Sequence, residues 1–368
     1  MSEHRRGGNQ RRWLPWAAAG TALVVGGVIG GVIVGSTQSS GSTASPSAST
    51  APAASGTVSS CQVTSVANQV VPSVVTIAAS GPEGSGTGSG EVIKSDGYIL
   101  TNNHVISIAA TSGGSVHVMF ADGKTEPATI TGRDPQSDLA VLKIQPPSGI
   151  KVIGLASGTV QVGQPVVAIG APLGLSSTVT AGIVSALDRT VQVPGDNDSL
   201  ALLVSALQTD AAINPGNSGG ALVDCAGKLV GVPTAGANVP GASGGGSIGL
   251  GFAIPVALAT SIADEIISTG RVTHAYFGLD TVPIPPEAIA EAGLRSGLWV
   301  QGVTAGGPAA QAGLRPGDIV TSVAGQPATS NQQLQELSLT KKAGDTVAIE
   351  YERNGAAAKT TVTLGAQP

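Results

Sequence analysis

The sequence predicts a mainly β protein with two antiparallel barrels, a smaller α+β domain after them, and an N-terminal transmembrane helix. Three observations lead to this fold class. The centre of the 368-residue chain consists of short β-prone runs separated by Gly, Pro and Asp, which is typical of barrels of antiparallel strands. Turn signals become frequent beyond Val272, and Trp13–Gly35 is apolar without a charged residue. A chain of this length has room for two or three domains.

The N-terminus is predicted to carry a basic cytoplasmic tail, residues 1–12, and a membrane-spanning helix, residues 13–35. At ~1.5 Å per residue this segment covers a hydrocarbon core of ~30 Å. Basic residues before a span place the N-terminus in the cytoplasm, so we expect a single-pass protein of the cell membrane with its remaining domains extracytoplasmic. A cleaved signal peptide is the alternative, because the small residues of 44–54 leave a cleavage site open.

Residues 36–60 are rich in Ser, Thr, Ala, Pro and Gly and contain no charge. Such a segment buries too little apolar surface to order itself, so it is predicted to be a disordered linker. The formal net charge is −5 although the N-terminal tail is basic. The domains after the linker are therefore acidic, which argues against nucleic acid as a partner.

Three residues in separate motifs have the side chains needed for nucleophilic catalysis. Ser218 lies in the Gly-rich run NPGNSGGAL, His104 follows the apolar run Tyr98–Leu100, and Asp138 precedes a buried strand-like run. A serine hydroxyl needs a base to take its proton and a third group to hold that base. Turns and solvated loop residues are the ordinary alternatives for each motif alone, but together they predict a catalytic triad.

The order His, Asp, Ser along the chain is that of the chymotrypsin double barrel, whereas other serine hydrolase folds use other orders. In that fold the backbone N–H groups of Gly216 and Ser218 are expected to form the oxyanion hole. The residue six positions before the nucleophile, here Ala212, lies at the floor of the specificity pocket. Its neutral side chain predicts cleavage after small or medium aliphatic residues, with loops 187–200 and 234–250 shaping the pocket.

Several separated motifs together resemble the HtrA family of trypsin-like serine proteases over about residues 75–365. They are GSGTGSG, DGYILTNNHV, DPQSDLAVLKI, VGQPVVAIGAPLGL, TVTAGIVSAL, QTDAAINPGNSGGALV and IGLGFAIP. The resemblance implies the same roles for His104, Asp138 and Ser218. The sequence departs from the family pattern at Glu91, Ala171 and Ala221, and the charged Glu91 is expected to face solvent or a regulatory partner.

The protease domain is predicted to span 61–270, because Pro255 opens a helix with a regular apolar face that stops near Gly270. Residues 271–368 contain Tyr276-Phe-Gly-Leu, GLRPGDIV and a capping box at Ser330 with Gln333. They resemble the PDZ domain of HtrA proteins. By that resemblance the amides of Phe277, Gly278 and Leu279 bind the carboxylate of C-terminal peptides, which add a strand beside the helix from Asn331. A domain that only spaces the protease is the alternative.

Cys61 and Cys225 are the only cysteines. An even number in an exported chain permits one disulfide, and two free thiols are the alternative. No cofactor is expected. The run GGGSIG lacks the βαβ context of a nucleotide site, and the His and Cys residues show no metal-ligand spacing.

The sequence thus predicts a membrane-anchored serine endopeptidase that cleaves unfolded or damaged proteins in envelope quality control and is regulated by its PDZ domain. An envelope chaperone or peptide-binding PDZ protein with a rarely assembled triad is the second interpretation, and a scaffold is the third. The family resemblance implies a homotrimer assembled through aromatic residues near the start of the protease domain. Val63–Ala79 contains no aromatic residue, so this assembly is an expectation only.

Overall fold

The computed structural model describes residues 61–171, 177–194, 196, 200–236, 246–292 and 295–367. The predicted basic tail, membrane span and linker lie outside these residues. Among the residues that are described, none of the helices is long and apolar enough to cross a membrane. The predictions for residues 1–60 therefore stay predictions.

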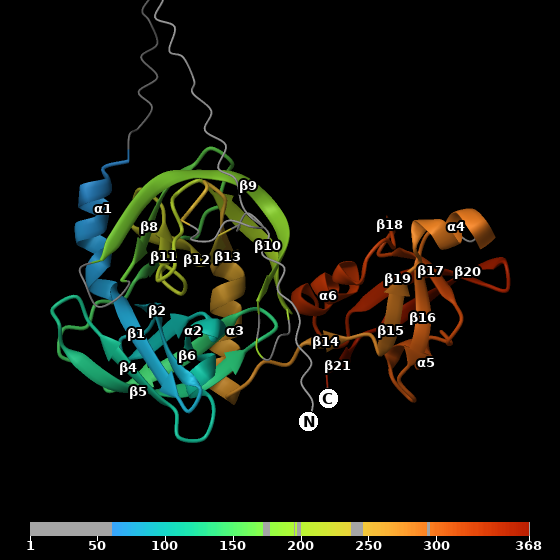
Figure 1. Ribbon diagram of the computed structural model, residues 1–368, viewed down its shortest axis with the longest axis horizontal. Coiled ribbons are helices and arrows are strands. Elements are labelled where there is room, and N and C mark those ends of the chain that lie inside the picture. The colour runs from blue at the N-terminus through green and yellow to red at the C-terminus, as the bar shows by residue number, and fades with distance from the viewer. Residues whose placement is uncertain are drawn as a thin grey trace, which may run out of the picture. The chain divides into compact units, whose positions relative to one another are not determined.

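Six strands of the N-terminal half form a closed antiparallel barrel in the order β1-β2-β3-β6-β5-β4 (Figure 1). Alternate residues of the first strand, Val75, Ile77 and Ala79, lie in the barrel core, as expected for a strand with one face buried. The bounds are β1 Val74–Gly81, β2 Gly84–Val92, β3 Tyr98–Thr101, β4 Ser115–Met119, β5 Thr125–Asp134 and β6 Leu139–Ile144.

A second sheet follows in the order β11-β8-β9-β10-β13-β12-β7, and an additional pairing of β11 with β12 closes six of its strands into another barrel. Both faces of β8 are buried, because Val166 and Ala168 belong to one core cluster and Val167 and Ile169 to another. The bounds are β7 Gly154–Leu155, β8 Pro165–Gly170, β9 Thr178–Pro194, β10 Leu200–Thr209, β11 Ala221–Val223, β12 Lys228–Gly236 and β13 Gly251–Pro255.

The two barrels share a core with the helix α3, Val256–Thr269. Ala259, Ile262 and Ile266 lie on its buried face, and Gly270 ends it in the left-handed conformation at φ 80°, where glycine carries no steric penalty. The predicted helix and its end are confirmed. This shared core holds the two barrels in one arrangement, so that side chains from both barrels meet at the interface between them.

The short helix α1, Val63–Val70, packs Val66 and Val70 into a cluster with β8 and β11 and is followed by the 3-10 turn η1, Val71–Ser73. The structure joins Cys61 to Cys225, with their Cα atoms 5.1 Å apart and 164 positions between them in sequence. Closing a loop of this size restricts the unfolded chain by on the order of 5 kcal/mol in the chain-entropy model. The bridge therefore fastens α1 beside the turn that follows β11.

The C-terminal residues form a separate core around a sheet in the order β15-β16-β17-β19-β20, with β18 paired to β17 and a small β14-β21 pair. The predicted capping box opens α6 at Ser330 and Gln333 and is confirmed. The bounds are β14 Ala275–Tyr276, β15 Leu279–Pro283, α4 Pro286–Ala292, β16 Leu298–Val303, α5 Pro308–Gln311, β17 Ile319–Val323, β18 Gln326–Pro327, α6 Asn331–Thr340, β19 Thr346–Arg353, β20 Ala356–Thr363 and β21 Gly365–Ala366.

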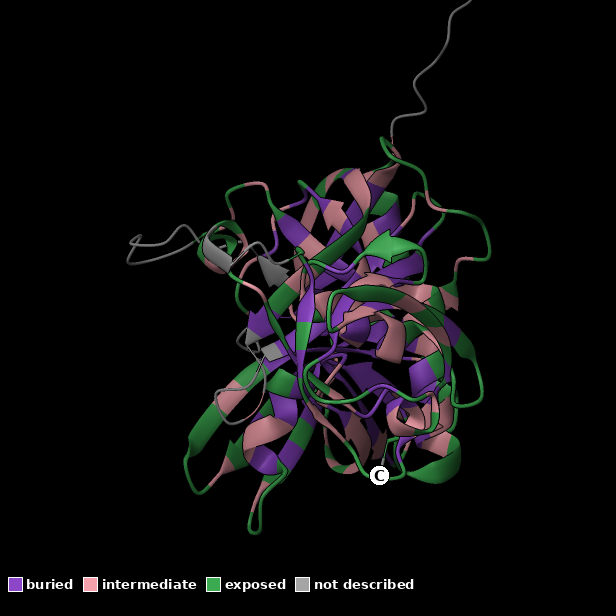
Figure 2. Ribbon diagram, turned by 90° about the vertical axis from the view of Figure 1, so that its right-hand side faces the viewer, coloured by how far each residue is buried: buried purple, intermediate pink, exposed green. Residues whose placement is uncertain are grey.

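Figure 2 shows buried residues gathered along the strands and exposed residues on many of the connecting loops. Charged residues are mostly exposed, but Glu91 on β2 has an exposed fraction of 0%. The expectation that it faces solvent or a partner is wrong. Gly90 contacts the first-barrel core, so strand alternation turns Glu91 to the opposite face, the side on which Ser89 reaches the second barrel.

Candidate active site

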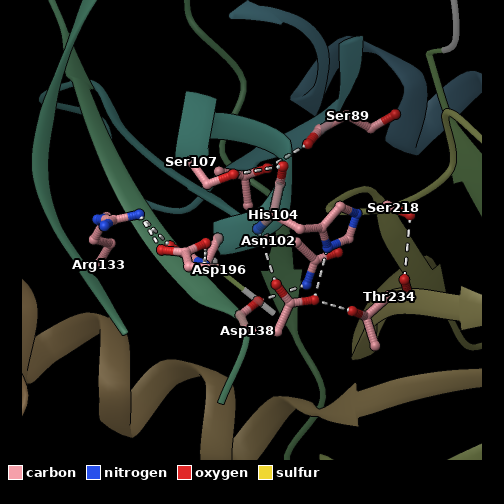
Figure 3. A network of polar contacts seen from close by, with 11 residues as sticks. Ser89, Asn102, His104, Ser107, Arg133, Asp138, Asp196, Ser218 and Thr234 are labelled. Atoms are coloured by element: carbon pink, nitrogen blue, oxygen red, sulfur yellow. Dashed lines mark hydrogen bonds and ion pairs between the residues drawn. The ribbon is translucent and has the colours of Figure 1, made fainter. Parts of the chain in front are cut away.

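His104 and Asp138 come from adjacent parts of the first barrel. His104 lies on the short helix α2, Asn103–Ile106, which directly follows β3 and continues into the 3-10 turn η2, Ser107–Ala109. Asp138 lies in the turn between β5 and β6. The Nδ1 of His104 is 2.8 Å from Oδ2 of Asp138, and the backbone N–H of His104 donates to Oδ1 at 2.9 Å (Figure 3). Because an ionised carboxylate only accepts, Nδ1 carries the hydrogen and Nε2 is left as the basic nitrogen.

The Asp138 side chain is 1% exposed and is fixed from the second barrel as well. The hydroxyl of Thr234 on β12 donates a short hydrogen bond to the same Oδ2. The Asp138 carbonyl accepts hydrogen bonds from Asn102 Nδ2 at 2.8 Å and from the Asn103 N–H at 3.1 Å. These bonds hold a residue at φ 57°, a conformation that costs energy for a non-glycine residue and needs such support.

Ser218 lies in the turn before β11 and faces the same region from the second barrel (Figure 3). Its Oγ donates to the carbonyl of Thr234 at 3.3 Å. The hydrogen bonds among the described residues include none from Ser218 to His104. The structure therefore brings all three predicted residues to the barrel interface, with the serine hydroxyl turned toward Thr234 instead of the imidazole.

The turn around Ser218 is held against β2 of the other barrel. Ser89 Oγ donates to the Gly216 carbonyl at 2.5 Å and accepts from the Ala171 N–H at 2.8 Å, and the Ser89 N–H donates to the Ser218 carbonyl at 2.9 Å. Gly219 has φ 78°, and a Cβ there would lie 2.3 Å from the Ser89 carbonyl oxygen. Only glycine fits this approach.

The N–H groups of Gly216 and Ser218 donate to no other described residue. Gly216 has φ 100°, and its carbonyl direction is set by the bond from Ser89. Two neighbouring N–H groups without internal partners are what an oxyanion hole requires.

Ala212 is half-buried, and its carbonyl accepts from Thr180 Oγ1 at 2.9 Å and Asn217 Nδ2 at 3.2 Å. Its backbone is thus tied to β9 and to the nucleophile turn. Of the two loops predicted to shape the pocket, 237–245 and most of 195–199 lie outside the described residues.

Asp196, the one described residue of 195–199, is bonded to the first barrel. Arg133 Nη1 lies 2.6 Å from Asp196 Oδ2 and 3.1 Å from Asn103 Oδ1, and Asn103 Nδ2 donates to Asp196 Oδ1 at 2.9 Å (Figure 3). Asn103 is the neighbour of His104 in α2. This network joins the loop after β9 to the helix that carries the imidazole.

Sequence reasoning did not find Ser89, Asn102 or Thr234 as supporting residues. Ser89 and Asn102 stand inside motifs that were recognised for other residues, GSGTGSG and TNNHV. Their roles depend on which barrel face each side chain points to, and that follows only from the pairing register. Thr234 lies 96 positions from its partner Asp138 and has no local signal.

In the C-terminal domain, Gly278 and Leu279 of the turn Phe277–Leu279 line a cavity of about 300 Å³ together with Gly302 and Val303 of β16. The N–H groups of Phe277 and Gly278 have no partner within the described part of the chain. Beside this turn, Asn331 at the start of α6 donates from Nδ2 to the Thr281 carbonyl at 2.7 Å and accepts from Thr281 Oγ1 at 2.8 Å. A strand added between β15 and α6 would compete with Asn331 for this carbonyl.

Family models agree with this division of the chain. Residues 88–232 match a trypsin-like peptidase domain and residues 278–364 a PDZ domain. Solved structures of the HtrA-type protease AlgW align over 83% of this chain, and one bound to a decapeptide is 33% identical with a TM-score of 0.65 and 99% of its own chain covered. The chain belongs to the HtrA family of serine proteases.

Two curated relatives are more than 40% identical to this chain. The serine protease PepD of Mycobacterium tuberculosis is 44% identical over 313 residues, which is 82% of this chain and 66% of PepD. The periplasmic pH-dependent serine endoprotease DegQ of Escherichia coli is 41% identical over 284 residues, 76% of this chain and 59% of DegQ. The chain thus spans less than two thirds of the length of these relatives.

Proposed function

We propose that this HtrA-family protein is a serine endopeptidase that hydrolyses peptide bonds by acyl transfer. In this mechanism Nε2 of His104 takes the proton of Ser218 as Oγ attacks the scissile carbonyl. Asp138 keeps Nδ1 protonated and stabilises the imidazolium that forms. The N–H groups of Gly216 and Ser218 stabilise the negative charge on the tetrahedral intermediate. His104 then gives the proton to the leaving amine, and water completes the cycle by the same route.

The observation that carries this proposal is the buried Asp138 carboxylate 2.8 Å from Nδ1 of His104. A buried carboxylate is unfavourable unless it is paired, and here its partners are the imidazole and the backbone N–H of His104 and the hydroxyl of Thr234. This is an arrangement for orienting a base. Rotation of the Ser218 side chain away from the Thr234 carbonyl would present Oγ to the free nitrogen of that base.

The same Ser218–Thr234 contact favours the second candidate, a chaperone or peptide-binding protein with a rarely assembled triad. If the hydroxyl stays on the Thr234 carbonyl, the base has no proton to remove and the PDZ domain is the working part. The two candidates differ in turnover. A protease hydrolyses casein, whereas a binding protein suppresses aggregation of an unfolded protein without cleaving it.

Hydrolysis of casein by wild type and Ser218→Ala tests the proposal directly. Loss of the nucleophile should lower the catalytic rate by about six orders of magnitude. Ser80→Ala, an exposed serine on β1, is the matched control and should leave the rate unchanged. Equal hydrolysis by wild type and Ser218→Ala would refute the assignment, and absence of hydrolysis with intact aggregation suppression would favour the chaperone.

Unfolded or damaged proteins are the substrates that we propose, with cleavage after small or medium aliphatic residues. The quality-control assignment is supported by membership of the HtrA family. The preference is supported by the neutral side chain of Ala212, which cannot pair with Lys or Arg. A peptide library digested by the protein should be cut mainly after Val, Ala or Ile, and cleavage mainly after basic residues would exclude this preference.

We propose that the PDZ domain regulates the protease by binding C-terminal peptides. The unpartnered N–H groups of Phe277 and Gly278 support carboxylate binding there, with that of Leu279 as the third donor. Peptides that end in a hydrophobic residue should bind the full chain at least tenfold more tightly than the same peptides amidated, which corresponds to about 1.4 kcal/mol. Equal affinity in calorimetry would exclude carboxylate recognition.

We also propose that residues 13–35 anchor the protein in the cell membrane, with residues 1–12 cytoplasmic and both domains extracytoplasmic. The charge-free apolar span and the arginines before it support this topology. Thermolysin added to cells stripped of their wall should digest the domains and spare the basic tail. Protection of the domains would show that the orientation is reversed.

A homotrimer is proposed for the assembly on family grounds alone. Multi-angle light scattering of residues 61–368 should give three times the monomer mass. A monomer or dimer would contradict the trimer.

A further inference from the structure

The turn that carries Asp138 is organised by a second buried aspartate. Asp134 ends β5, is 3% exposed, and accepts the Gln136 N–H at 3.2 Å through Oδ1. Ser137, also 3% exposed, donates a short hydrogen bond to Oδ2. Side-chain bonds of this kind fix the backbone of a tight turn. The residue that follows the turn is Asp138, at φ 57°.

A residue from a distant part of the chain completes this turn. Nε2 of His274 is 2.8 Å from Oδ1 of Asp134, 140 positions away, and His274 is 7% exposed. His274 lies in the segment between α3 and β14, where the protease domain passes into the PDZ domain. Its imidazole therefore donates to a carboxylate on the turn that holds Asp138.

The same segment is bonded to the end of the chain. The Gln367 N–H donates to the His274 carbonyl at 2.9 Å, and Gln136 Nε2 donates to Gln367 Oε1 at 2.8 Å. The Gln136 carbonyl in turn accepts the Leu202 N–H of β10 at 3.1 Å, and Leu202 packs against Leu339 of α6. The turn before Asp138 is thus contacted by the connecting segment, by the C-terminal residues and by β10.

Three other charged residues lie near His274. Glu265 on α3 accepts the Thr273 N–H at 2.8 Å. Glu265, Lys341 and Lys342 line, with His274, a cavity of about 310 Å³ between α3, β10 and α6. Asp134 is the acidic group that His274 contacts directly.

We propose that His274 is a positioning residue for catalysis, which holds the Asp134–Ser137 turn and thereby sets the orientation of Asp138 against His104. This assignment rests on the proposed peptidase function. It also gives the PDZ domain a route to the triad, because displacement of the segment around His274 removes one of the three bonds that shape the turn.

A merely structural role for His274 makes a different prediction. If the bond only fastens the two domains, its loss lowers the thermal midpoint and leaves the chemistry of the remaining folded molecules unchanged. If the bond positions Asp138, its loss weakens the stabilisation of protonated His104. The acid limb of the pH profile then moves to lower pH, and the rate at the plateau falls.

The test measures the rate of Ser218 modification by a fluorophosphonate probe from pH 5 to 9 on the full chain, alongside the thermal midpoint. His274→Ala should lower the plateau rate about tenfold, which corresponds to 1.4 kcal/mol, and shift the acid limb to lower pH. His274→Gln keeps an N–H donor at a similar reach and should restore most of both. His117→Ala, an exposed histidine on β4, is the matched control and should behave as wild type.

Ser137→Ala removes the other side-chain bond to Asp134 and should shift the acid limb in the same direction, which provides a second variant if His274→Ala folds poorly. An unchanged profile in folded His274→Ala and Ser137→Ala, with a lowered thermal midpoint alone, would overturn the inference. That outcome leaves the proposed function intact, whereas a wild-type protein that does not react with the probe at any pH refutes the proposed function itself.

Discussion

The two halves of the proposed triad are built to different degrees. On the first barrel, Asp138 and His104 are joined by two hydrogen bonds, and Asp138 receives a third from Thr234. On the second barrel, the Ser218 side chain makes one hydrogen bond to a described residue, at 3.3 Å to a carbonyl outside the triad. The general base is therefore held by several hydrogen bonds, while the nucleophile is held by one weak bond to a residue outside the triad.

This difference indicates where control of the proposed peptidase can act. Reorienting a base with several short bonds costs several hydrogen bonds, each worth about 1 kcal/mol or more. Turning a serine hydroxyl costs one weak bond. We expect variants on the Asp138 side to disable the base, and variants of the residues that support the Ser218 turn to change how often the nucleophile is engaged.

Among the residues that support the base and the nucleophile, the largest effect is expected for Asp138→Asn. The amide would present an N–H₂ group or a neutral oxygen to Nδ1 of His104, and the imidazole would lose the tautomer needed for catalysis. The catalytic rate on casein should fall about ten-thousand-fold with the fold intact. Asp122→Asn, an exposed aspartate paired with Lys124, is the control. A fall of less than tenfold for Asp138→Asn would show that the base does not need this carboxylate.

Ser89→Ala tests the other side of the comparison, the support of the turn that carries Ser218. The substitution removes the bond to the Gly216 carbonyl and leaves the Ala171 N–H without a partner, which should lower stability by about 1–3 kcal/mol. The turn that carries the oxyanion donors then loses its support, and the catalytic rate should fall about tenfold to a hundredfold, at most the loss for one direct donor.

Ser85→Ala, exposed on the same strand, should match wild type in both measurements. Unaltered kinetics in Ser89→Ala would show that the oxyanion turn holds its geometry without the barrel contact.

Glu91 extends the comparison to stability. It lies on the interface face of β2, and its two carboxylate oxygens accept no hydrogen bond from any described residue. Burial raises the pKa of this carboxyl well above its ordinary value of 4.5. The unfolded chain ionises first, so stability should fall as pH rises from about 4.5 toward the raised pKa and stay low above it.

Glu91→Leu should remove this pH dependence and raise the thermal midpoint at neutral pH. Glu83→Gln, an exposed position, should leave the slope of midpoint against pH as in wild type. The same downward slope in Glu91→Leu would assign the pH dependence to other groups.

Much of this arrangement follows from local sequence. The runs around His104, Asp138 and Ser218 predicted the strands that precede or follow them, and the structure has β3, β6 and β11 there. Gly270 and the pair Ser330 and Gln333 predicted helix ends through short-range chemistry.

The parts that were missed depend on contacts between distant segments. The register in which β2 pairs with β1 and β3 decides whether Glu91 faces solvent or the other barrel. A register shift of one residue would turn every side chain of the strand to the opposite face. The Asp134–His274 pair spans 140 positions. No local pattern distinguishes its members from solvated loop residues.

The most direct test of the central claim is to identify the residue that a fluorophosphonate probe modifies in the full chain. The account predicts a single adduct per chain on the peptide containing Ser218, absent in Ser218→Ala and formed orders of magnitude more slowly in His104→Ala. An adduct on another serine, or casein hydrolysis by a protein in which Ser218 stays unmodified, would contradict it.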